Sequence, residues 1–240
     1  VRNGNRIGVD DSANDLAIFL AQGREMAEQG GFADVDAFTH TVDGTAFLNG
    51  TWGAQRLFYA IWRVAGWGGL QLTLACAVCG TVVLTAWGAR RAGRSTAVAG
   101  FGAMLAVWLV VQNLGMRPQL FALPLFAAYA TIAMTVPPGL ATGVASAVLV
   151  GVWANLHGSF AIAPVLSACV AAGVAWEQAA AERSWAEWAR AVARSLLRGE
   201  GRAHLLTAGA VAAAACVNPY GASIWLYVAL NTSSPAARGL

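Results

Sequence analysis

Long apolar stretches separated by short polar breaks dominate the chain from residue 67 onward. A helix that crosses a membrane needs about 20 mostly apolar residues. Measured against that length, the pattern predicts five or six spanning helices, at 68–89, 95–115, 118–136, 139–156, 158–176 and from near Leu205 into the turn at Asn218. A further apolar piece at 222–230 is too short to span alone. The sequence therefore predicts an all-α fold, a polytopic transmembrane helical bundle.

Residues 1–66 show a different pattern, with no long apolar run and eight of the twelve acidic residues. Between Asn14 and Gln29 the apolar positions recur at helical spacing, and residues 52–65 repeat that amphipathic pattern. Ser12 and Asp15 have the spacing of a capping box, which gives Asp15 a purely structural alternative role. We therefore expect two domains: an extracytoplasmic head over 1–66, whose amphipathic helices rest on the membrane surface, and the bundle over 67–240.

The segment 177–204 is the most basic part of the chain. Its arginines recur at a spacing near four residues and are mixed with Trp185 and Trp188. Charges at that spacing share one helical face. The segment is therefore expected to be an amphipathic helix lying on an anionic membrane surface. A basic groove for a partner is the alternative.

Two short motifs in the apolar region have structural interpretations. Cys76 and Cys79 have CxxC spacing, but no second cysteine pair and no nearby His accompany them. They are expected to be small residues that face neighbouring helices or lipid, and not a metal site. Gly139-x-x-x-Gly143 predicts close packing of two helices.

The arginines also predict an orientation in the membrane. Short loops rich in Lys or Arg face the cytoplasm, and the loop 90–94 and the segment 177–204 meet that description. Counting spans from them puts the head and three polar loops together on the outer side. The polar residues gathered there are Asp15, Asp36, His40, Asn113, Arg117, Gln119, Asn155, His157 and Asn218.

Composition agrees with a membrane protein and narrows the possible partners. Of the 240 residues, 58% are hydrophobic and 11% are charged, whereas an average soluble domain is roughly a quarter charged. The net charge of +3 and the absence of a dense basic patch argue against a nucleic-acid partner. The chain begins at Val1, and a head that lies outside is expected to follow an upstream helix, so we expect a piece of a longer protein.

Six segments, taken in order, resemble motifs of one family of bacterial membrane proteins. They are 15–24 (DLAIFLAQGR), 31–39 (GFADVDAFT), 41–52 (TVDGTAFLNGTW), 117–121 (RPQLF), 153–160 (WANLHGSF) and 218–221 (NPYG). In this set the chain resembles the GT-C-type integral membrane glycosyltransferases, in their dolichyl-phosphate-mannose and lipid-A-modifying branch. The resemblance covers most of residues 15–221.

The resemblance implies a specific activity. GT-C enzymes take a sugar from a polyprenyl-phosphate carrier outside the bacterial plasma membrane and pass it to a cell-envelope acceptor. An acidic residue of the first outer loop acts there as catalytic base or metal ligand. Asp15 matches that position, with Mg²⁺ or Mn²⁺ as the implied ion, and Asp36 matches a second acidic position. The chain departs from the family where Phe19 stands in place of an expected His.

The chemistry of glycosyl transfer points to the same residues. One carboxylate is sufficient to accept the proton of the acceptor hydroxyl, and the phosphate leaving group needs a cation. Arg117 is the expected phosphate clamp, with a snorkelling interfacial arginine as the alternative. His157 is expected either to bind substrate or to cap the fourth span.

The remaining expected substrate-binding residues are Gln119, Asn155 and His40. Two other function classes stay open beside the glycosyltransferase. A transporter of envelope precursors predicts charged or broken helices at the bilayer midplane, whereas the predicted spans are apolar at their centres. A non-catalytic membrane scaffold stays open because Phe19 stands in place of the expected His.

Overall fold

The computed structural model describes residues 11–32, 48–111 and 115–233, and this part of the chain is helical without strands. Its helices are α1 (Asp11–Gln29), α2 (Trp52–Arg91), α3 (Thr96–Val111), α4 (Gln119–Thr135), α5 (Leu140–Leu156), the 3₁₀ turn η1 (Gly158–Ala161), α6 (Ile162–Ala179), α7 (Trp185–Arg198), α8 (Glu200–Ala214) and α9 (Ser223–Ser233). The all-α expectation is confirmed for the described residues.

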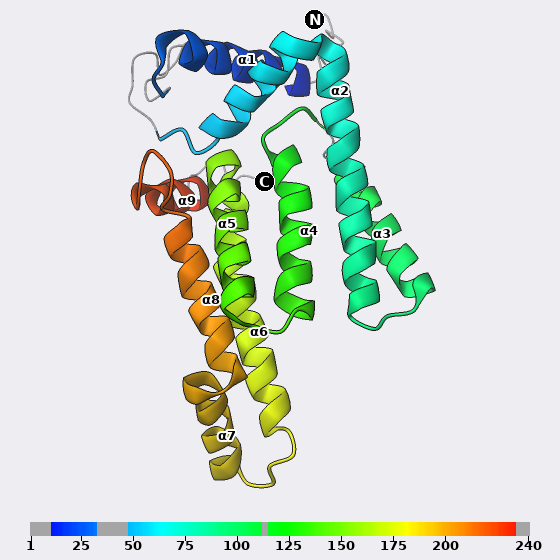
Figure 1. Cartoon of the computed structure of the whole chain (residues 1–240), viewed down its shortest axis with the longest axis vertical. Helices are drawn as coiled ribbons and strands as arrows, with labels where there is room; N and C mark the ends of the chain where they lie inside the picture. The colour runs from blue at the N-terminus through cyan, green and yellow to red at the C-terminus, as the bar shows by residue number, and fades with distance from the viewer. Residues whose placement is uncertain (1–10, 33–47, 112–114, 234–240) are drawn as a thin grey trace, which may run out of the picture.

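A sharp bend at Gly66 divides α2 into two parts that run in different directions. Gly66 has φ 58° and ψ −151°, a conformation that is essentially restricted to glycine. Before the bend, residues 52–65 and α1 lie across one end of the bundle, and after it α2 runs along the bundle (Figure 1). We call α1 and residues 52–65 the head layer. The predicted head ends at the residue where α2 bends.

The two helices of the head layer pack closely because α1 has a glycine at the contact. A Cβ atom at Gly23 would collide with the backbone carbonyl of Gln55 and with the Tyr59 side chain. On the same face of α1, Leu16 and Met26 are buried. The amphipathic pattern read from Asn14 to Gln29 therefore corresponds to a helix that packs on α2.

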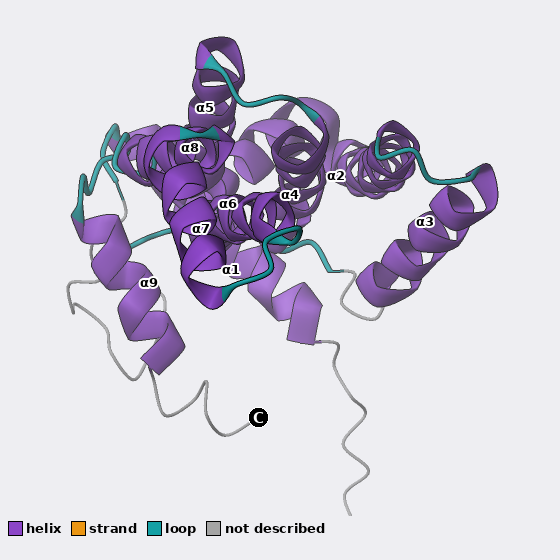
Figure 2. Ribbon diagram, turned by 90° about the horizontal axis from the view of Figure 1, so that it is seen from below, coloured by secondary structure: helices purple, strands orange, loops and turns teal. Residues whose placement is uncertain are grey.

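Beneath the head layer, α2, α4, α5, α6 and α8 run beside one another (Figures 1 and 2). Large side chains fill the core between them, including Tyr129, Trp153 and Phe160. The Tyr129 hydroxyl and Ser167 Oγ, both fully buried, lie 2.6 Å apart and join α4 to α6. This hydrogen bond satisfies two polar groups that burial would otherwise penalise.

Two helical segments of the described residues are long and apolar enough to cross a membrane, Trp52–Arg91 and Gly158–Ala179. The helices α4 and α5 are also apolar, with 17 residues each, and α3 has 16. α3 packs on α2 at the side of the molecule and exposes Phe101, Met104 and Trp108 (Figure 2). By length and composition, the two long segments support membrane association.

The amphipathic helix expected over 177–204 is present as α7 (Trp185–Arg198), but it does not extend over the whole segment. α6 continues to Ala179, α7 starts after Ser184, and Gly199 separates α7 from α8. Ser184 Oγ accepts a hydrogen bond from the Glu187 backbone N–H at 3.2 Å and donates one to Oε2 of Glu187 at 2.7 Å. This capping box begins α7, which runs beside α6 and does not lie across the end of the bundle (Figure 1).

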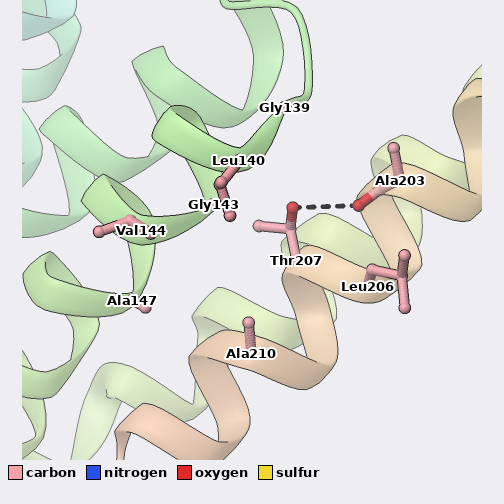
Figure 3. Close-up of a pocket in the computed structure, with 9 residues that line it drawn as sticks. All are labelled: Gly139, Leu140, Gly143, Val144, Ala147, Ala203, Leu206, Thr207 and Ala210. Atoms are coloured by element: carbon pink, nitrogen blue, oxygen red, sulfur yellow. Dashed lines mark hydrogen bonds between the residues drawn. The ribbon is translucent and has the colours of Figure 1, made fainter.

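The close packing predicted at Gly139 and Gly143 is wrong. A Cβ atom at either glycine would meet no atom within 4 Å. Both glycines line an open apolar groove of about 390 Å³ between α5 and α8 (Figure 3). The two helices approach each other at Gly151, whose added Cβ would lie 3.4 Å from the Ala214 carbonyl oxygen. They diverge from there toward Gly139.

Candidate functional site

Asp15 and Arg117 form an ion pair at the end of the bundle covered by the head layer. Oδ2 of Asp15 lies 2.8 Å from Nη2 of Arg117, and each side chain is 40% exposed. Asp15 belongs to α1, whereas Arg117 precedes the first turn of α4, where its carbonyl accepts a hydrogen bond from Leu120 N–H. Since α1 begins at Asp11, Asp15 lies in the second helical turn. Its carboxylate there binds an arginine that is distant in the sequence. The side chain of Ser12, the partner in the predicted capping box, lies outside the described part of the structure.

An apolar cluster forms the floor beneath this ion pair. Leu16 follows Asp15 in the sequence, and Leu120 lies in the first turn of α4 after Arg117. Both leucines are buried together with Phe58 and Leu70. Phe19 packs against the same cluster. The position at which the family resemblance expects His is therefore part of a hydrophobic contact, and its side chain supplies no proton donor or acceptor.

Arg117 has further hydrogen-bonding capacity. Its Nε atom is buried and has no hydrogen-bond partner among the described residues. A guanidinium group presents five N–H donors in a planar fork that matches phosphate and carboxylate geometry. Asp15 is within bonding distance of one terminal nitrogen. The group therefore combines a full positive charge, partial solvent access and donors that an oxyanion can use.

Asn155 is a junction between three segments at this end of the molecule. Its Oδ1 accepts a hydrogen bond from Trp52 Nε1 at 3.2 Å. Its Nδ2 donates to the carbonyl oxygens of Gly151 and Val217, each at 2.8 Å. The start of α2, the end of α5 and the turn that follows α8 are therefore connected through one amide. Its polar atoms are engaged by the protein itself.

His157 follows α5 and caps the short turn η1. Its Nδ1 accepts a hydrogen bond from Ser159 N–H at 3.1 Å and lies 2.8 Å from Ser159 Oγ. Burial lowers the pKa of His157 below its ordinary value of 6.5. The neutral imidazole, with its proton on Nε2, satisfies these contacts. The side chain therefore caps the segment after α5, whereas at the end of α5 itself only the His157 backbone N–H bonds, to the Trp153 carbonyl.

The other predicted site residues are distributed differently. Gln119 is exposed in the first turn of α4, two residues beyond Arg117. Asn218 stabilises the turn after α8, donating to the Ala215 carbonyl at 2.6 Å and accepting from Tyr220 N–H at 2.8 Å. Asp36, His40 and Asn113 lie outside the described residues.

Sequence reasoning missed a pair of buried amides beside the head layer. Asn49 Nδ2 donates to Gln55 Oε1 at 2.7 Å, and Gln55 Nε2 donates back to Asn49 Oδ1 at 3.1 Å. Asn49 is 2% exposed and Gln55 is 2% exposed, so this reciprocal bond fixes the entry into α2. Asn-Gly is a typical turn dipeptide, but no local pattern indicates the bonding partner six residues later.

The described residues contain no group of three or more His, Cys, Asp or Glu side chains placed to hold a metal ion. Asp15 is an acidic residue whose nearest charged partner is a cation, so this arrangement does not resemble a Mg²⁺ site built from several oxygen ligands. Cys76 and Cys79 are free and exposed.

Comparison of the chain with protein-family models, with curated proteins and with solved structures finds no match.

Proposed function

We propose that this chain is a membrane glycosyltransferase that moves a sugar from a polyprenyl-phosphate carrier to a cell-envelope acceptor. The observation that carries the proposal is the ion pair between Asp15 and Arg117 at one end of an apolar helical bundle. A carboxylate and a guanidinium side by side are the two groups that such a transfer needs. The motif order that resembles the GT-C family supports the same activity.

In the proposed reaction the acceptor hydroxyl oxygen attacks the anomeric carbon of the sugar. The bond from that carbon to the carrier phosphate oxygen breaks, and polyprenyl phosphate leaves with the bonding electrons. The Asp15 carboxylate accepts the proton of the hydroxyl, and the Arg117 guanidinium offsets the negative charge on the departing phosphate. Atoms and charge balance without a further reactant.

The ion pair itself is compatible with opening on substrate binding. A half-exposed pair of this kind contributes about 0–1 kcal/mol to stability. A phosphate group offers more negative charge and more acceptor oxygens than one carboxylate. It therefore replaces Asp15 on Arg117 at small cost and leaves the carboxylate available as a base.

The proposed reaction does not require a divalent metal ion. The donors described around Asp15 do not fit Mg²⁺ or Mn²⁺, because its neighbour at 2.8 Å is the Arg117 guanidinium. Arg117 therefore supplies the positive charge at the leaving group. Stabilisation by the carriers is therefore measured both with and without Mg²⁺ or Mn²⁺.

The proposed setting is the bacterial plasma membrane, crossed several times. Arg90, Arg91 and Arg94 lie at the far end of α2 from the head layer, at the end of the bundle from which α7 extends (Figure 1). By the positive-inside rule that end faces the cytoplasm, which puts Asp15 and Arg117 on the outer side. A lipid-linked sugar and an envelope acceptor meet on that side.

A non-catalytic membrane scaffold is the second candidate, and one observation favours it. Phe19, in place of the expected His, packs into the apolar cluster under the ion pair. A scaffold protein would keep the head layer and the hydrogen bonds of Asn155 but would not bind polyprenyl phosphate or its sugar conjugates. The experiment separates these two functions directly.

The test compares thermal unfolding of the protein in detergent with and without polyprenyl phosphate and its sugar conjugates. Ligand that binds the folded state raises the unfolding midpoint by mass action. We expect carriers to stabilise the wild type and not Arg117→Ala, with and without Mg²⁺ or Mn²⁺. Arg24→Ala is the matched control, because Arg24 is an exposed α1 arginine paired with Glu28.

Stabilisation that disappears only in Arg117→Ala supports the carrier site and leads to transfer assays. Stabilisation that needs the metal ion would move the phosphate-binding role from Arg117 to that ion. If no carrier stabilises the wild type, the proposed glycosyltransferase activity is wrong and the scaffold function is favoured.

A further inference from the structure

A second candidate site lies at the other end of the bundle, in a groove between α2, α3 and α4. The groove has a volume of about 510 Å³, and small or apolar side chains such as Ala106, Phe126, Ala130 and Met134 form most of its wall. It exists because α3 packs on α2 and stands away from the rest of the bundle (Figure 2). The proposed function does not use this groove.

The hydroxyl groups in the wall are already satisfied by the protein. Thr81 donates to the Ala77 carbonyl at 2.7 Å, and Thr85 donates to the Thr81 carbonyl at 2.8 Å. Across the groove, Thr131 donates to the Leu84 carbonyl at 3.3 Å. These threonines therefore present no free donor to a ligand. The wall suits a hydrocarbon chain.

The mouth of the groove is positively charged. Arg94 lines it, and Arg90 and Arg91 lie in the last turn of α2 beside it. Nη1 of Arg90 donates to the Arg94 carbonyl at 2.8 Å, which holds two of these residues together. Within the described part of the chain, none of the three arginines forms an ion pair with an acidic residue. The mouth is therefore complementary to an anionic headgroup.

We propose that this groove binds an anionic phospholipid, with an acyl chain along the wall and the phosphate at Arg94 and Arg90. One side of the groove is α3, whose outer face exposes Phe101, Met104 and Trp108 and belongs in hydrocarbon. A lipid of the surrounding leaflet reaches the groove by lateral diffusion. The combination of an apolar wall with a charged mouth selects an amphiphile over a free phosphate ion.

The groove between α5 and α8 provides an internal comparison. It is also apolar and is lined by residues such as Leu206, Thr207 and Ala210 (Figure 3). No arginine lines it. A substitution there changes an apolar groove of similar character without touching the three arginines.

The experiment titrates the whole protein in detergent with phosphatidylglycerol and with phosphatidylcholine of identical acyl chains. Bound lipid is counted by native mass spectrometry, and the unfolding midpoint is measured in parallel. We expect saturable binding and stabilisation by phosphatidylglycerol only, with no effect of inorganic phosphate. Arg94→Gln should weaken phosphatidylglycerol binding about tenfold, the effect of losing one charge-assisted hydrogen bond.

Matched variants test charge and shape separately. Arg198→Gln removes the same charge from α7, outside the groove, and should leave binding unchanged. Ala130→Phe fills the groove and should abolish binding, whereas Ala210→Phe in the groove between α5 and α8 should not. If Ala130→Phe does not fold, Ala92→Phe, at an exposed position on the groove wall, replaces it.

Any of four results would overturn the proposal. Equal binding of the two lipids would mean that the headgroup is not recognised. Equal loss in Arg94→Gln and Arg198→Gln would indicate diffuse electrostatic attraction. Unchanged binding in both groove-filling variants, or a lipid-independent dimer that covers α3, would assign the groove to another occupant.

Discussion

Oδ2 of Asp15 in α1 lies 2.8 Å from Nη2 of Arg117, which precedes α4, so one ion pair connects the head layer to the bundle. Both side chains are partly exposed, and an apolar cluster that includes Phe58 and Leu120 packs at the same junction. The pair is therefore better placed for chemistry or ligand binding than for stability. That distinction has a direct test.

For Asp15→Asn we expect a large loss of activity with little change in stability. A half-exposed ion pair contributes about 0–1 kcal/mol, so the free energy of unfolding should change by no more than that. Loss of a general base lowers a transfer rate by about 10²–10⁴-fold. Thermal unfolding and a sugar-transfer assay measure the two effects.

Glu28→Gln is the control for Asp15→Asn. Glu28 is an acidic residue of the same helix, and its arginine partner, Arg24, lies one turn away on the exposed surface. The Glu28→Gln substitution should change neither stability nor transfer appreciably. An Asp15→Asn variant with full activity would remove Asp15 from the proposed mechanism. A strongly destabilised one would make the pair structural.

The bend in α2 predicts opposite effects of two neighbouring glycine substitutions. Gly66 has φ 58° and ψ −151°, which an alanine adopts only with strain, so Gly66→Ala should lower the free energy of unfolding by about 1–3 kcal/mol. Gly68 is helical, and a Cβ atom there would meet nothing within 4 Å. Gly68→Ala should stabilise by up to about 1 kcal/mol. Thermal or denaturant unfolding of both variants checks the bend, and equal effects would contradict it.

The buried hydrogen bond between Tyr129 and Ser167 predicts a non-additive mutant cycle. Tyr129→Phe or Ser167→Ala leaves one hydroxyl buried without its partner, which costs about 1–3 kcal/mol. The double variant removes both polar groups, so it should lose less stability than the two single variants together. Additive losses would mean that the two hydroxyls do not interact.

Because His157 is partly buried, we expect the protein to lose stability in mild acid. Burial lowers the pKa of His157 below 6.5, so the unfolded state binds a proton more readily than the folded state. The contribution of the neutral ring is complete above about pH 6.5 and is lost as the pH falls through the lowered pKa. The unfolding midpoint should therefore fall between about pH 7 and pH 5, and less steeply in His157→Gln.

His204 needs its own variant in that experiment. Burial also lowers the pKa of His204, while the Glu200 carboxylate raises it, so His204 adds to the same pH dependence. His204→Gln removes this share and leaves that of His157. If His157→Gln unfolds with the wild-type pH dependence, His157 is not the group that titrates.

The positions of the helices could be predicted from the sequence because the length of an apolar stretch and the polar residues that interrupt it are local properties. The predicted spans 118–136 and 139–156 correspond to α4 at Gln119–Thr135 and α5 at Leu140–Leu156. The arginine spacing predicted the amphipathic helix that forms as α7, but it did not show where that helix begins and ends within the segment 177–204. The capping box at Ser184 and the break at Gly199 were present in the sequence and divide it.

The sequence by itself determined an all-helical chain with apolar helices, a distinct head and a set of polar residues to examine. Only the tertiary structure decided that Asp15 faces Arg117, that Asn155 is engaged by Trp52 and Val217, and that α5 and α8 diverge at Gly143. The reason is physical. Periodicity and hydrophobic length depend on neighbours along the chain, whereas a hydrogen-bond partner depends on how each helix is rotated and where it crosses the next. Those rotations are set by packing over the whole bundle, and no local pattern encodes them.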